Sequence, residues 1–196
     1  MTKGGKCMLE LRPMNEAEIR QLYIRALSRD FPPSELQSLS SILTMYHKGL
    51  YDVLGAYQDD LLVGYALLYC PKNDCLLLLD YLAVEPAFRN QGIGTALLNQ
   101  LRIHYAPQAE VLLIECERPV SAPDELEARK RIRFYTNVGA VLTSVRIWLF
   151  DVEYSILILP CSQTVPKCDW SVKMLDLYRQ MLPDELYKQN VRLIRA

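Results

Sequence analysis

The sequence predicts an α+β domain built on a mixed, mostly antiparallel sheet. Two observations lead to this prediction. Apolar or alternating segments of strand length fill much of the first half of the chain, with turn residues between them, which is typical of an antiparallel meander. In the second half a strand-like segment, a segment with helical spacing and another strand-like segment follow one another, and such a crossover favours parallel pairing.

In the first half the boundaries follow from capping and turn residues. The expected elements are a strand over 7–11, helices over 15–29 and 34–47, and strands over 51–57, 61–70 and 75–84. Asn15 and Glu18 have the spacing of a capping box, and Ser34 is expected to open the second helix. Gly49 fits the C-terminal cap of that helix.

The second half alternates helical and extended segments. The expected elements are a helix over 94–105, a strand over 111–116, a helix from 123 or 124 to 138, strands over 141–150 and 154–159, and helices over 172–181 and 185–191. We expect one domain over residues 7–162, and a C-terminal helical extension over 163–196 that packs on the same domain.

Composition and charge exclude several classes of protein. The chain has 196 residues, of which 51% are hydrophobic and 23% charged, so it has enough apolar material for a core and does not resemble a disordered or collagenous chain. Its 22 basic and 23 acidic residues give a net charge of -1, which disfavours nucleic acid as a partner.

Membrane and metal sites are not predicted either. No apolar run approaches the roughly 20 residues that span a bilayer, and no apolar segment follows the first six residues as it would in a signal peptide. We therefore expect a cytoplasmic protein that does not bind membranes. The six cysteines match no zinc spacing and are expected to be reduced and mostly buried, and no metal site is expected.

Residues 82–98 carry the motif with chemical content, because a strand ends, a loop follows and a helix starts on glycines. The first turn of a helix has unpaired amides and the positive end of the dipole. Gly92 and Gly94 allow a bulky anion to approach those amides, and Arg89 adds a fork of donors suited to phosphate. The pattern favours a site for a pyrophosphate.

A dinucleotide-binding oxidoreductase is the rival interpretation of this motif. Glu115 lies near the position of the acidic residue that such a site needs, but Leu97 occupies the third glycine position of the fingerprint. The segment 85–91 is also long for the tight first turn, and it follows a meander rather than opening a parallel array. A P-loop is excluded because no Gly-Lys-Ser/Thr follows.

The spacing Arg89-x-x-Gly92-x-Gly94 is similar to the (Arg/Gln)-x-x-Gly-x-(Gly/Ala) signature of the GCN5-related N-acetyltransferase (GNAT) family. Three further segments match that family in order, namely Leu11-Arg12-Pro13-Met14, Leu62-Val63-Gly64-Tyr65-Ala66 and Phe134-Tyr135-Thr136-Asn137-Val138-Gly139-Ala140. The chain thus resembles a bacterial-type GNAT member over residues 9–160. The resemblance implies α/β/α layers and a splayed central pair of parallel strands.

The resemblance also implies acetyl-CoA, or another acyl-CoA, as co-substrate. Main-chain groups of the strand end would pair with the pantetheine arm, and backbone amides of the loop would hold the pyrophosphate. The residues expected to bind the cofactor are Leu82, Ala83, Val84, Arg89, Asn90, Gln91, Gly92, Ile93, Gly94 and Thr95.

For catalysis, Tyr135 matches the general acid of the family. The ordinary pKa of a tyrosine, about 10, exceeds that of a thiol, about 8.5, so proton donation to a leaving thiolate depends on position. Glu117 is the first candidate for the general base, with Glu115 and Asp80 as alternatives near the same strand ends. Cys116 is a less favoured nucleophile, because direct transfer is the usual route of the family.

Two positions depart from the family pattern. Ala128 stands where many members have an asparagine that contacts pantetheine, and Arg131 stands where a small residue is usual. A basic cluster on the same predicted helix either meets the 3′-phosphate of CoA or is a solvated face; it comprises Arg129, Lys130, Arg131 and Arg133. On the acceptor side, Asp30 and Glu35 are candidates for attracting a cationic amine.

The sequence therefore predicts an N-acetyltransferase. It would transfer an acetyl group from acetyl-CoA to a primary amine of a small molecule or peptide, by direct attack in a ternary complex. The alternative is a catalytically weak acyl-CoA-binding regulatory module, for which the replacement of asparagine by Ala128 leaves room. The expected assembly is a monomer or a homodimer.

Overall fold

A computed structural model describes residues 8–72, 74–162 and 168–194. Cys7, the predicted start of the first strand and of the domain, and residue 163, the predicted start of the extension, lie outside these residues. The chain divides into two compact units. Unit 1 comprises Met1–Cys70 and Asp80–Leu101, and unit 2 comprises Pro71–Leu79 and Arg102–Ala196. Each unit is described by itself.

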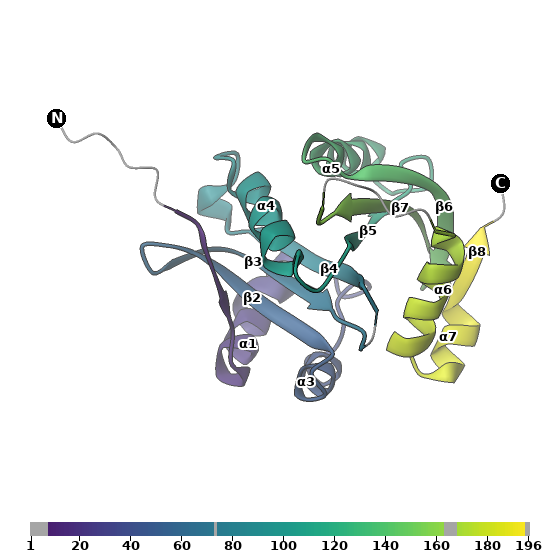
Figure 1. The fold of residues 1–196 in the computed structure, drawn as a ribbon, viewed down its shortest axis with the longest axis horizontal. Helices are drawn as coiled ribbons and strands as arrows, with labels where there is room; N and C mark the ends of the chain where they lie inside the picture. The colour runs from purple at the N-terminus through teal and green to yellow at the C-terminus, as the bar shows by residue number, and fades with distance from the viewer. Residues whose placement is uncertain (1–7, 73, 163–167, 195–196) are drawn as a thin grey trace. The chain divides into compact units, whose positions relative to one another are not determined.

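Unit 1 contains an antiparallel meander. Its strands are β1 (Glu10–Pro13), β2 (Tyr51–Gln58), β3 (Leu61–Tyr69) and the second half of β4 (Leu76–Val84). Strands β1 and β2 pair antiparallel, as do β2 and β3 (Figure 1). Asp59 and Asp60 both have positive φ, at 48° and 64°, and make the two-residue turn of the second hairpin. The predicted meander is confirmed.

The helical segments of unit 1 begin with one continuous helical stretch. The segments are α1 (Glu16–Leu22), the π-helical turn η1 (Tyr23–Leu27), α2 (Ser28–Asp30), α3 (Leu39–His47), the 3-10 turn η2 (Pro86–Phe88) and most of α4 (Ile93–Tyr105). The capping box is confirmed, because the Glu18 amide donates to Asn15 Oδ1 over 3.1 Å and the Asn15 amide donates to Glu18 Oε2 over 2.8 Å. The predicted cap at Gly49 is also confirmed, with φ of 64°.

The start of the second helix was predicted wrongly. Helix α3 begins at Leu39 rather than near Ser34, and Ser38 caps it by accepting the Ser41 amide over 3.1 Å. The Tyr81 hydroxyl binds backbone groups of the segment that precedes the helix. It donates to the Glu35 carbonyl over 2.8 Å and accepts the Gln37 amide over 2.9 Å. These tertiary bonds hold the segment outside the helix.

Strand β3 approaches β4 closely at Gly64. A Cβ at this position would lie 2.9 Å from the Ala83 carbonyl oxygen and 3.4 Å from the Leu97 side chain of α4. The Glu85 amide donates to the Val63 carbonyl over 2.9 Å just beyond the strand end. Gly64 therefore lets the end of β4 lie against β3 with no side chain between them.

Unit 2 contains the parallel strand pair. The first half of β4 pairs with β5 (Val111–Glu117) in parallel, from Leu76 opposite Val111 to Leu79 opposite Ile114. Strand β5 then pairs antiparallel with β7 (Val152–Pro160), and β7 with β6 (Val141–Leu149). The predicted α+β class with a mixed sheet and a parallel pair is confirmed. The parallel register ends at Leu79 and Ile114, and the splaying of the two strands stays a prediction.

The C-terminal segment of unit 2 contains a strand that the sequence did not predict. Helices α6 (Trp170–Met181) and α7 (Asp184–Asn190) are followed by β8 (Val191–Ile194), which pairs antiparallel with β6. The predicted helices are confirmed. Strand β8 has only four residues, so its alternation is too short to be distinguished from a helix end. Its hydrogen bonds to β6, which are tertiary contacts, decide its conformation.

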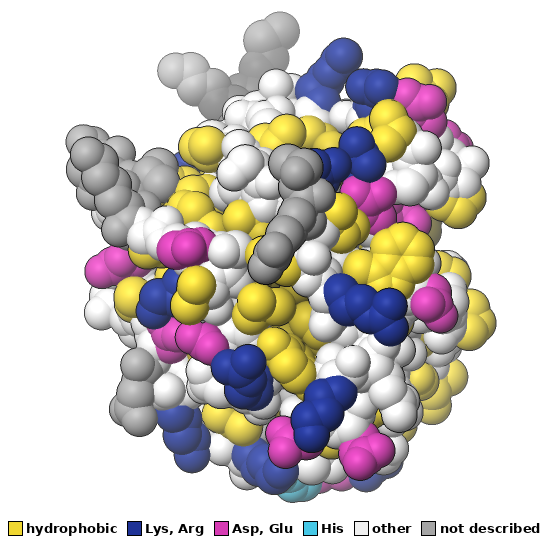
Figure 2. All heavy atoms as spheres, turned by 90° about the vertical axis from the view of Figure 1, so that its right-hand side faces the viewer, with side chains coloured by type: hydrophobic (Ala, Val, Ile, Leu, Met, Phe, Trp, Pro, Cys, Tyr) yellow, Lys and Arg dark blue, Asp and Glu magenta, His cyan; other side chains and the backbone are white. Residues whose placement is uncertain are grey.

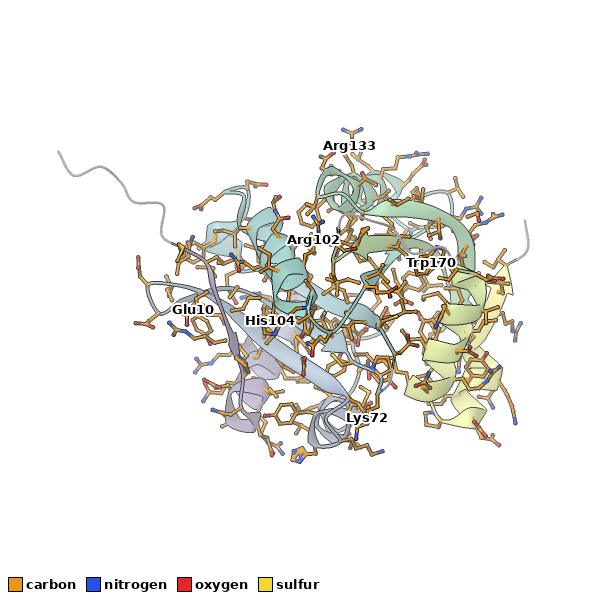
Figure 3. The ribbon with its side chains drawn as sticks, viewed as in Figure 1. Glu10, Lys72, Arg102, His104, Arg133 and Trp170 are labelled. Carbon is orange, nitrogen blue, oxygen red and sulfur yellow. The ribbon has the colours of Figure 1, made fainter. Side chains whose placement is uncertain are left out.

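Helix α5 (Glu125–Asn137) completes unit 2 and is anchored at both ends. Asp124 caps its start by accepting the Glu127 amide over 2.9 Å. Near its end, Arg102 donates from Nε to the Pro160 carbonyl over 2.8 Å and from Nη1 to the Val138 carbonyl over 3.4 Å (Figure 3). The helix is therefore fixed to the end of β7.

The surface carries both signs of charge. On the face drawn in Figure 2, basic and acidic side chains are interspersed with apolar ones. Within the described ranges, no helix combines the length and the apolar character that crossing a membrane requires.

Candidate functional site

In unit 1 a loop carries the chain from β4 into α4. This loop, from Glu85 to Thr95, is called the glycine loop below. After the turn η2 the chain is extended at Arg89, and it then reverses at Asn90 and Gly92, whose φ angles are 60° and 80°. Asparagine and glycine are the residues that adopt this left-handed conformation most readily. The predicted order of strand, loop and helix is confirmed.

The chain is open to solvent at Gly92, just before α4 begins. The Ala96 amide donates to the Gly92 carbonyl over 3.0 Å, and the amides of the first turn before it lack an intrahelical acceptor. A Cβ built on Gly92 would meet no atom within 4 Å, and Gln91 and Thr95 are also exposed. Amides at the positive end of a helix that is open to solvent are suited to bind an anion.

The Arg89 side chain has partners within unit 1. Its Nε donates to the Val84 carbonyl over 3.0 Å, and its Nη2 donates to Asp30 Oδ1 over 2.9 Å. The guanidinium is thus held against the end of β4. Sequence reasoning did not find Asp30 as a partner of Arg89, because the two are 59 positions apart and no local pattern joins them.

Asp30 is a buried carboxylate shared by two arginines. Its side chain is 5% exposed, and its Oδ2 accepts hydrogen bonds of 2.8 Å from Arg29 and from the Tyr65 hydroxyl. Burial acts to raise the pKa of Asp30, but the hydrogen bonds from Arg29 and Tyr65, together with the charge of Arg89, hold it below the usual value. Asp30 neutralises arginines of its own chain, which argues against the predicted role in attracting a cationic amine.

Asp80 lies on β4, two residues before Leu82, and is only partly exposed. Its Oδ2 accepts from Gln37 Nε2 over 2.7 Å and from the Tyr51 hydroxyl. Burial raises the pKa of Asp80 to about 6, against the effect of those two hydrogen bonds. Oδ1 takes no part in either bond. A carboxylate that is oriented through one oxygen and titrates near pH 6 is suited to general base chemistry.

In unit 2, Tyr135 lies on the buried side of α5, where its residue is 9% exposed. Burial raises the pKa of the phenol well above its usual value, nearby Cys116 adds to that effect and Arg131 opposes it. The hydroxyl therefore stays protonated across the neutral range. It is available as a hydrogen-bond donor.

Glu117 is the last residue of β5 and lies opposite Tyr154 of β7. Its side chain is 12% exposed and forms an ion pair of 3.5 Å with Arg131. Arg131 lies one helical turn before Tyr135, at the position where the GNAT family, which this chain resembles, usually has a small residue. The pair occupies one oxygen of the carboxylate that the sequence ranks first as base.

Cys116 lies between Glu115 and Glu117 in the sequence and is fully buried. Burial raises the pKa of the Cys116 thiol to about 12, while Arg131 lowers it and Glu115 and Glu117 raise it. The thiol is therefore protonated near neutral pH. This argues against Cys116 as the nucleophile, since the thiolate is the reactive form.

The basic cluster of α5 is largely paired with acids of unit 2. Arg129 bonds Glu125 over 2.6 Å, Lys130 bonds Glu127 over 3.3 Å, and Arg131 bonds Glu117 over 3.5 Å. Arg133 extends outward from α5 in Figure 3 and forms no ion pair within the described part of the chain. Ala128, on the same helix, is fully buried and offers no polar group.

The burial of Cys116 predicts its reactivity. We expect a thiol reagent such as iodoacetamide at pH 8 to modify the exposed Cys168 well before Cys116, which is fully buried with a pKa of about 12. Peptide mass spectrometry of samples quenched over time measures both rates. Modification of Cys116 as fast as Cys168 in the folded protein would contradict this structure and return Cys116 to the candidate nucleophiles.

The comparisons with known proteins agree with this architecture. Residues 50–139 match the model of the acetyltransferase (GNAT) domain. No curated protein matches the chain.

In the part of the chain that the structure describes, no group of three or more His, Cys, Asp and Glu side chains is placed to hold a metal ion.

Solved structures with the same fold include three distant proteins. A protein from Bacteroides thetaiotaomicron assigned to the GNAT acetyltransferases has a TM-score of 0.69 at 20% identity, covering 89% of this chain and 99% of its own. A spermidine N-acetyltransferase from Vibrio cholerae, in complex with CoA and spermine, has a TM-score of 0.62 at 12% identity, with coverages of 80% and 97%. The ribosomal-protein-S18-alanine N-acetyltransferase from Escherichia coli has a TM-score of 0.59 at 18% identity, with coverages of 83% and 99%. The resemblance stated from the glycine motif and its ordered neighbours is thereby confirmed: residues 50–139 match the model of the GNAT acetyltransferase domain, and the fold is that of solved GNAT structures.

Proposed function

We propose that this protein transfers an acetyl group from acetyl-CoA to a primary amine of a small molecule or peptide. The glycine loop carries the proposal, because it has open space at Gly92 and first-turn amides of α4 without intrahelical acceptors, inside the segment that matches the GNAT domain. Structures of the same fold include proteins named as N-acetyltransferases of spermidine and of a ribosomal-protein alanine, one of them in complex with CoA. These names support an amine acceptor and a CoA donor for this chain.

The donor site would be formed by the end of β4 and the glycine loop. Main-chain groups of Leu82, Ala83 and Val84 would pair with pantetheine, and the segment is partly exposed whereas Leu76–Leu79 are buried. The amides from Asn90 to Thr95 would hold the pyrophosphate, with Arg89 at the entry of the loop. The open space at Gly92 supports this assignment, since a phosphate oxygen must come within about 3 Å of an amide nitrogen.

The reaction needs one proton acceptor and one donor. The neutral amine attacks the thioester carbon, a C–N bond forms, and the C–S bond breaks with its electron pair moving to sulfur. The amine nitrogen loses a proton to a base, and CoA leaves as a thiolate that takes a proton from water once it is released. Tyr135 would donate to the developing thiolate. Its raised pKa makes complete proton transfer to a thiolate uphill, so stabilisation by a hydrogen bond is the role that this environment favours.

Asp80 is the base that we propose, with Glu117 as the second candidate. Asp80 has a pKa of about 6 and an oxygen, Oδ1, outside its hydrogen bonds to Tyr51 and Gln37. Glu117 is engaged by Arg131. A base that titrates just below neutral pH is deprotonated at pH 7 and still accepts a proton readily.

Calorimetric titration with acetyl-CoA tests the donor site, with NAD as the control ligand for the dinucleotide alternative. We expect acetyl-CoA to bind and NAD not to bind. Gly92→Ala should weaken acetyl-CoA binding about tenfold or more, because its methyl group projects into the anion site from a strained backbone. Gly49→Ala is a matched control, since Gly49 also has positive φ and no neighbour within 4 Å of a Cβ.

Equal acetyl-CoA affinity in the two glycine variants would remove the glycine loop from the donor site. Binding of NAD in place of acetyl-CoA would favour the oxidoreductase alternative. Acetyl-CoA binding without turnover on a broad amine panel would favour a regulatory CoA-binding module over an enzyme.

Tyr135→Phe tests the hydrogen-bond donor. We expect turnover to fall about 100-fold or more, as is typical when a hydrogen-bond donor to a developing negative charge is removed, while acetyl-CoA affinity stays the same. Tyr178→Phe is the control, because Tyr178 is also buried in unit 2 and its hydroxyl has no hydrogen-bond partner among the described residues. Steady-state kinetics and calorimetry on both variants measure the effect. Unchanged turnover in Tyr135→Phe would exclude the hydroxyl from the mechanism.

The pH dependence of turnover distinguishes the two bases. With Asp80 as base, kcat/KM calculated for the neutral form of the amine rises with pH through about 6 and then levels, and Asp80→Asn loses most of the rate. Asparagine keeps an oxygen for Tyr51 and Gln37.

The pKa of Asp80 is raised in the fold, so the wild type loses stability as pH rises from about 4 to about 6 and the neutral variant does not. We therefore expect the variant to be at least as stable at pH 7. A larger loss of turnover in Glu117→Gln than in Asp80→Asn would assign the base to Glu117.

A further inference from the structure

We propose that Asp30 is a positioning residue of the CoA site, which fixes the Arg89 guanidinium so that the glycine loop meets the pyrophosphate with its backbone amides. This inference rests on the proposed function of the loop. It assigns Arg89 to the support of the loop, and it adds a residue of the α2 end to the donor site.

The Arg89 side chain closes the entry of the glycine loop. It reaches back from position 89 to bond the Val84 carbonyl over 3.0 Å, so the turn η2 lies within a closed ring of backbone and side chain. Its Nη2 bonds Asp30 over 2.9 Å at the same time. A planar guanidinium that is bonded on two sides has a defined orientation. The backbone that follows, Asn90 to Gly92, starts from this fixed point.

Asp30 is itself held by a rigid partner. Its second oxygen accepts from the Tyr65 hydroxyl over 2.8 Å, and Tyr65 is a fully buried residue of β3. Arg29 bonds that same oxygen and also pairs with Glu85, the first residue of the glycine loop, over 3.1 Å. Two carboxylates and two guanidinium groups thus join the α2 end to both sides of η2. Their formal charges balance.

The burial of Asp30 opposes a change of partner by Arg89. The Asp30 side chain is only 5% exposed, so water could not replace Arg89 if the arginine turned to another anion. Removing Arg89 from it would leave a buried carboxylate with only part of its compensation, which is strongly unfavourable. We therefore expect Arg89 to stay on Asp30 when acetyl-CoA binds. The amides at the start of α4, which lack intrahelical acceptors, are the donors left for the pyrophosphate.

The π-helical turn accounts for the position of Asp30. Between α1 and α2 the turn η1 is closed by the Ser28 backbone N–H, which donates to the Tyr23 carbonyl, and the Ser28 hydroxyl donates to the same carbonyl over 2.8 Å. One extra residue in a helical turn rotates all later side chains by about 100° relative to an unbroken helix. Asp30, which ends α2, is placed by this rotation.

Asp30→Asn tests the inference by comparing two donors. Acetyl-CoA contains the pyrophosphate, and S-acetyl-pantetheine has the same thioester and arm without it. We expect the variant to bind acetyl-CoA about tenfold or more weakly and S-acetyl-pantetheine as the wild type does, with both affinities measured by calorimetry. Asp60→Asn is the matched control, because Asp60 also pairs with an arginine of unit 1, Arg12 over 2.8 Å, but is exposed.

Arg89→Lys serves as a second variant if Asp30→Asn does not fold. Lysine keeps the charge but cannot bond Val84 and Asp30 through one planar group, so we expect the same selective loss of acetyl-CoA affinity. Unchanged acetyl-CoA affinity would overturn the inference. Tighter binding in Asp30→Asn would also overturn it, because Arg89 would then be a phosphate ligand that Asp30 restrains. Equal loss with both donors would show a general structural role instead.

The outcome for the wild type separates this inference from the proposed function. A wild-type protein that does not bind acetyl-CoA would overturn both. A wild-type protein that binds acetyl-CoA, with Gly92→Ala impaired and Asp30→Asn normal, would leave the proposed function standing and overturn only the role of Asp30.

Discussion

The parallel pairing of β4 with β5 is the constraint from which the candidate donor site follows. A parallel strand cannot be reached through a two-residue hairpin, so the chain must leave β4 through a loop and a helix before β5 begins. That route places the start of α4 just after a strand end, with its first amides free of intrahelical acceptors. Asn90 and Gly92 satisfy the backbone reversal that the route demands. The proposed anion site is therefore a consequence of the strand order.

Charge compensation shapes both halves of the proposed machinery. In unit 1, the positive charges of Arg29 and Arg89 balance the negative charges of Asp30 and Glu85 beside the glycine loop. In unit 2, most of the basic cluster on α5 is paired with glutamates, and Arg131 engages Glu117. The sequence pattern made these groups look open to phosphate or to an amine. Their pairing inside the chain leaves backbone amides as the donors with the clearest opening for an anion.

Desolvation separates the titratable groups by role. Burial raises the pKa of Asp80 to about 6 and that of Cys116 to about 12, and it raises the pKa of Tyr135 well above its usual value. Near neutral pH this makes Asp80 a carboxylate of useful basicity and keeps the thiol and the phenol protonated. The same physical effect, acting on three acids of different intrinsic strength, supports a base, a silent thiol and a hydrogen-bond donor.

By itself the sequence determined the fold class, most element boundaries and the glycine loop, because these depend on local signals: hydrophobic periodicity, the Asn15–Glu18 capping box, and glycines after a strand. Tertiary structure decided the rest. Helix α3 starts at Leu39 because Tyr81, far along the chain, takes the backbone groups before it, and β8 is a strand because β6 offers it an edge. The pairing of Arg89 with Asp30 and of Glu117 with Arg131 depends on residues that only folding brings together, and no local pattern of residues encodes such a contact.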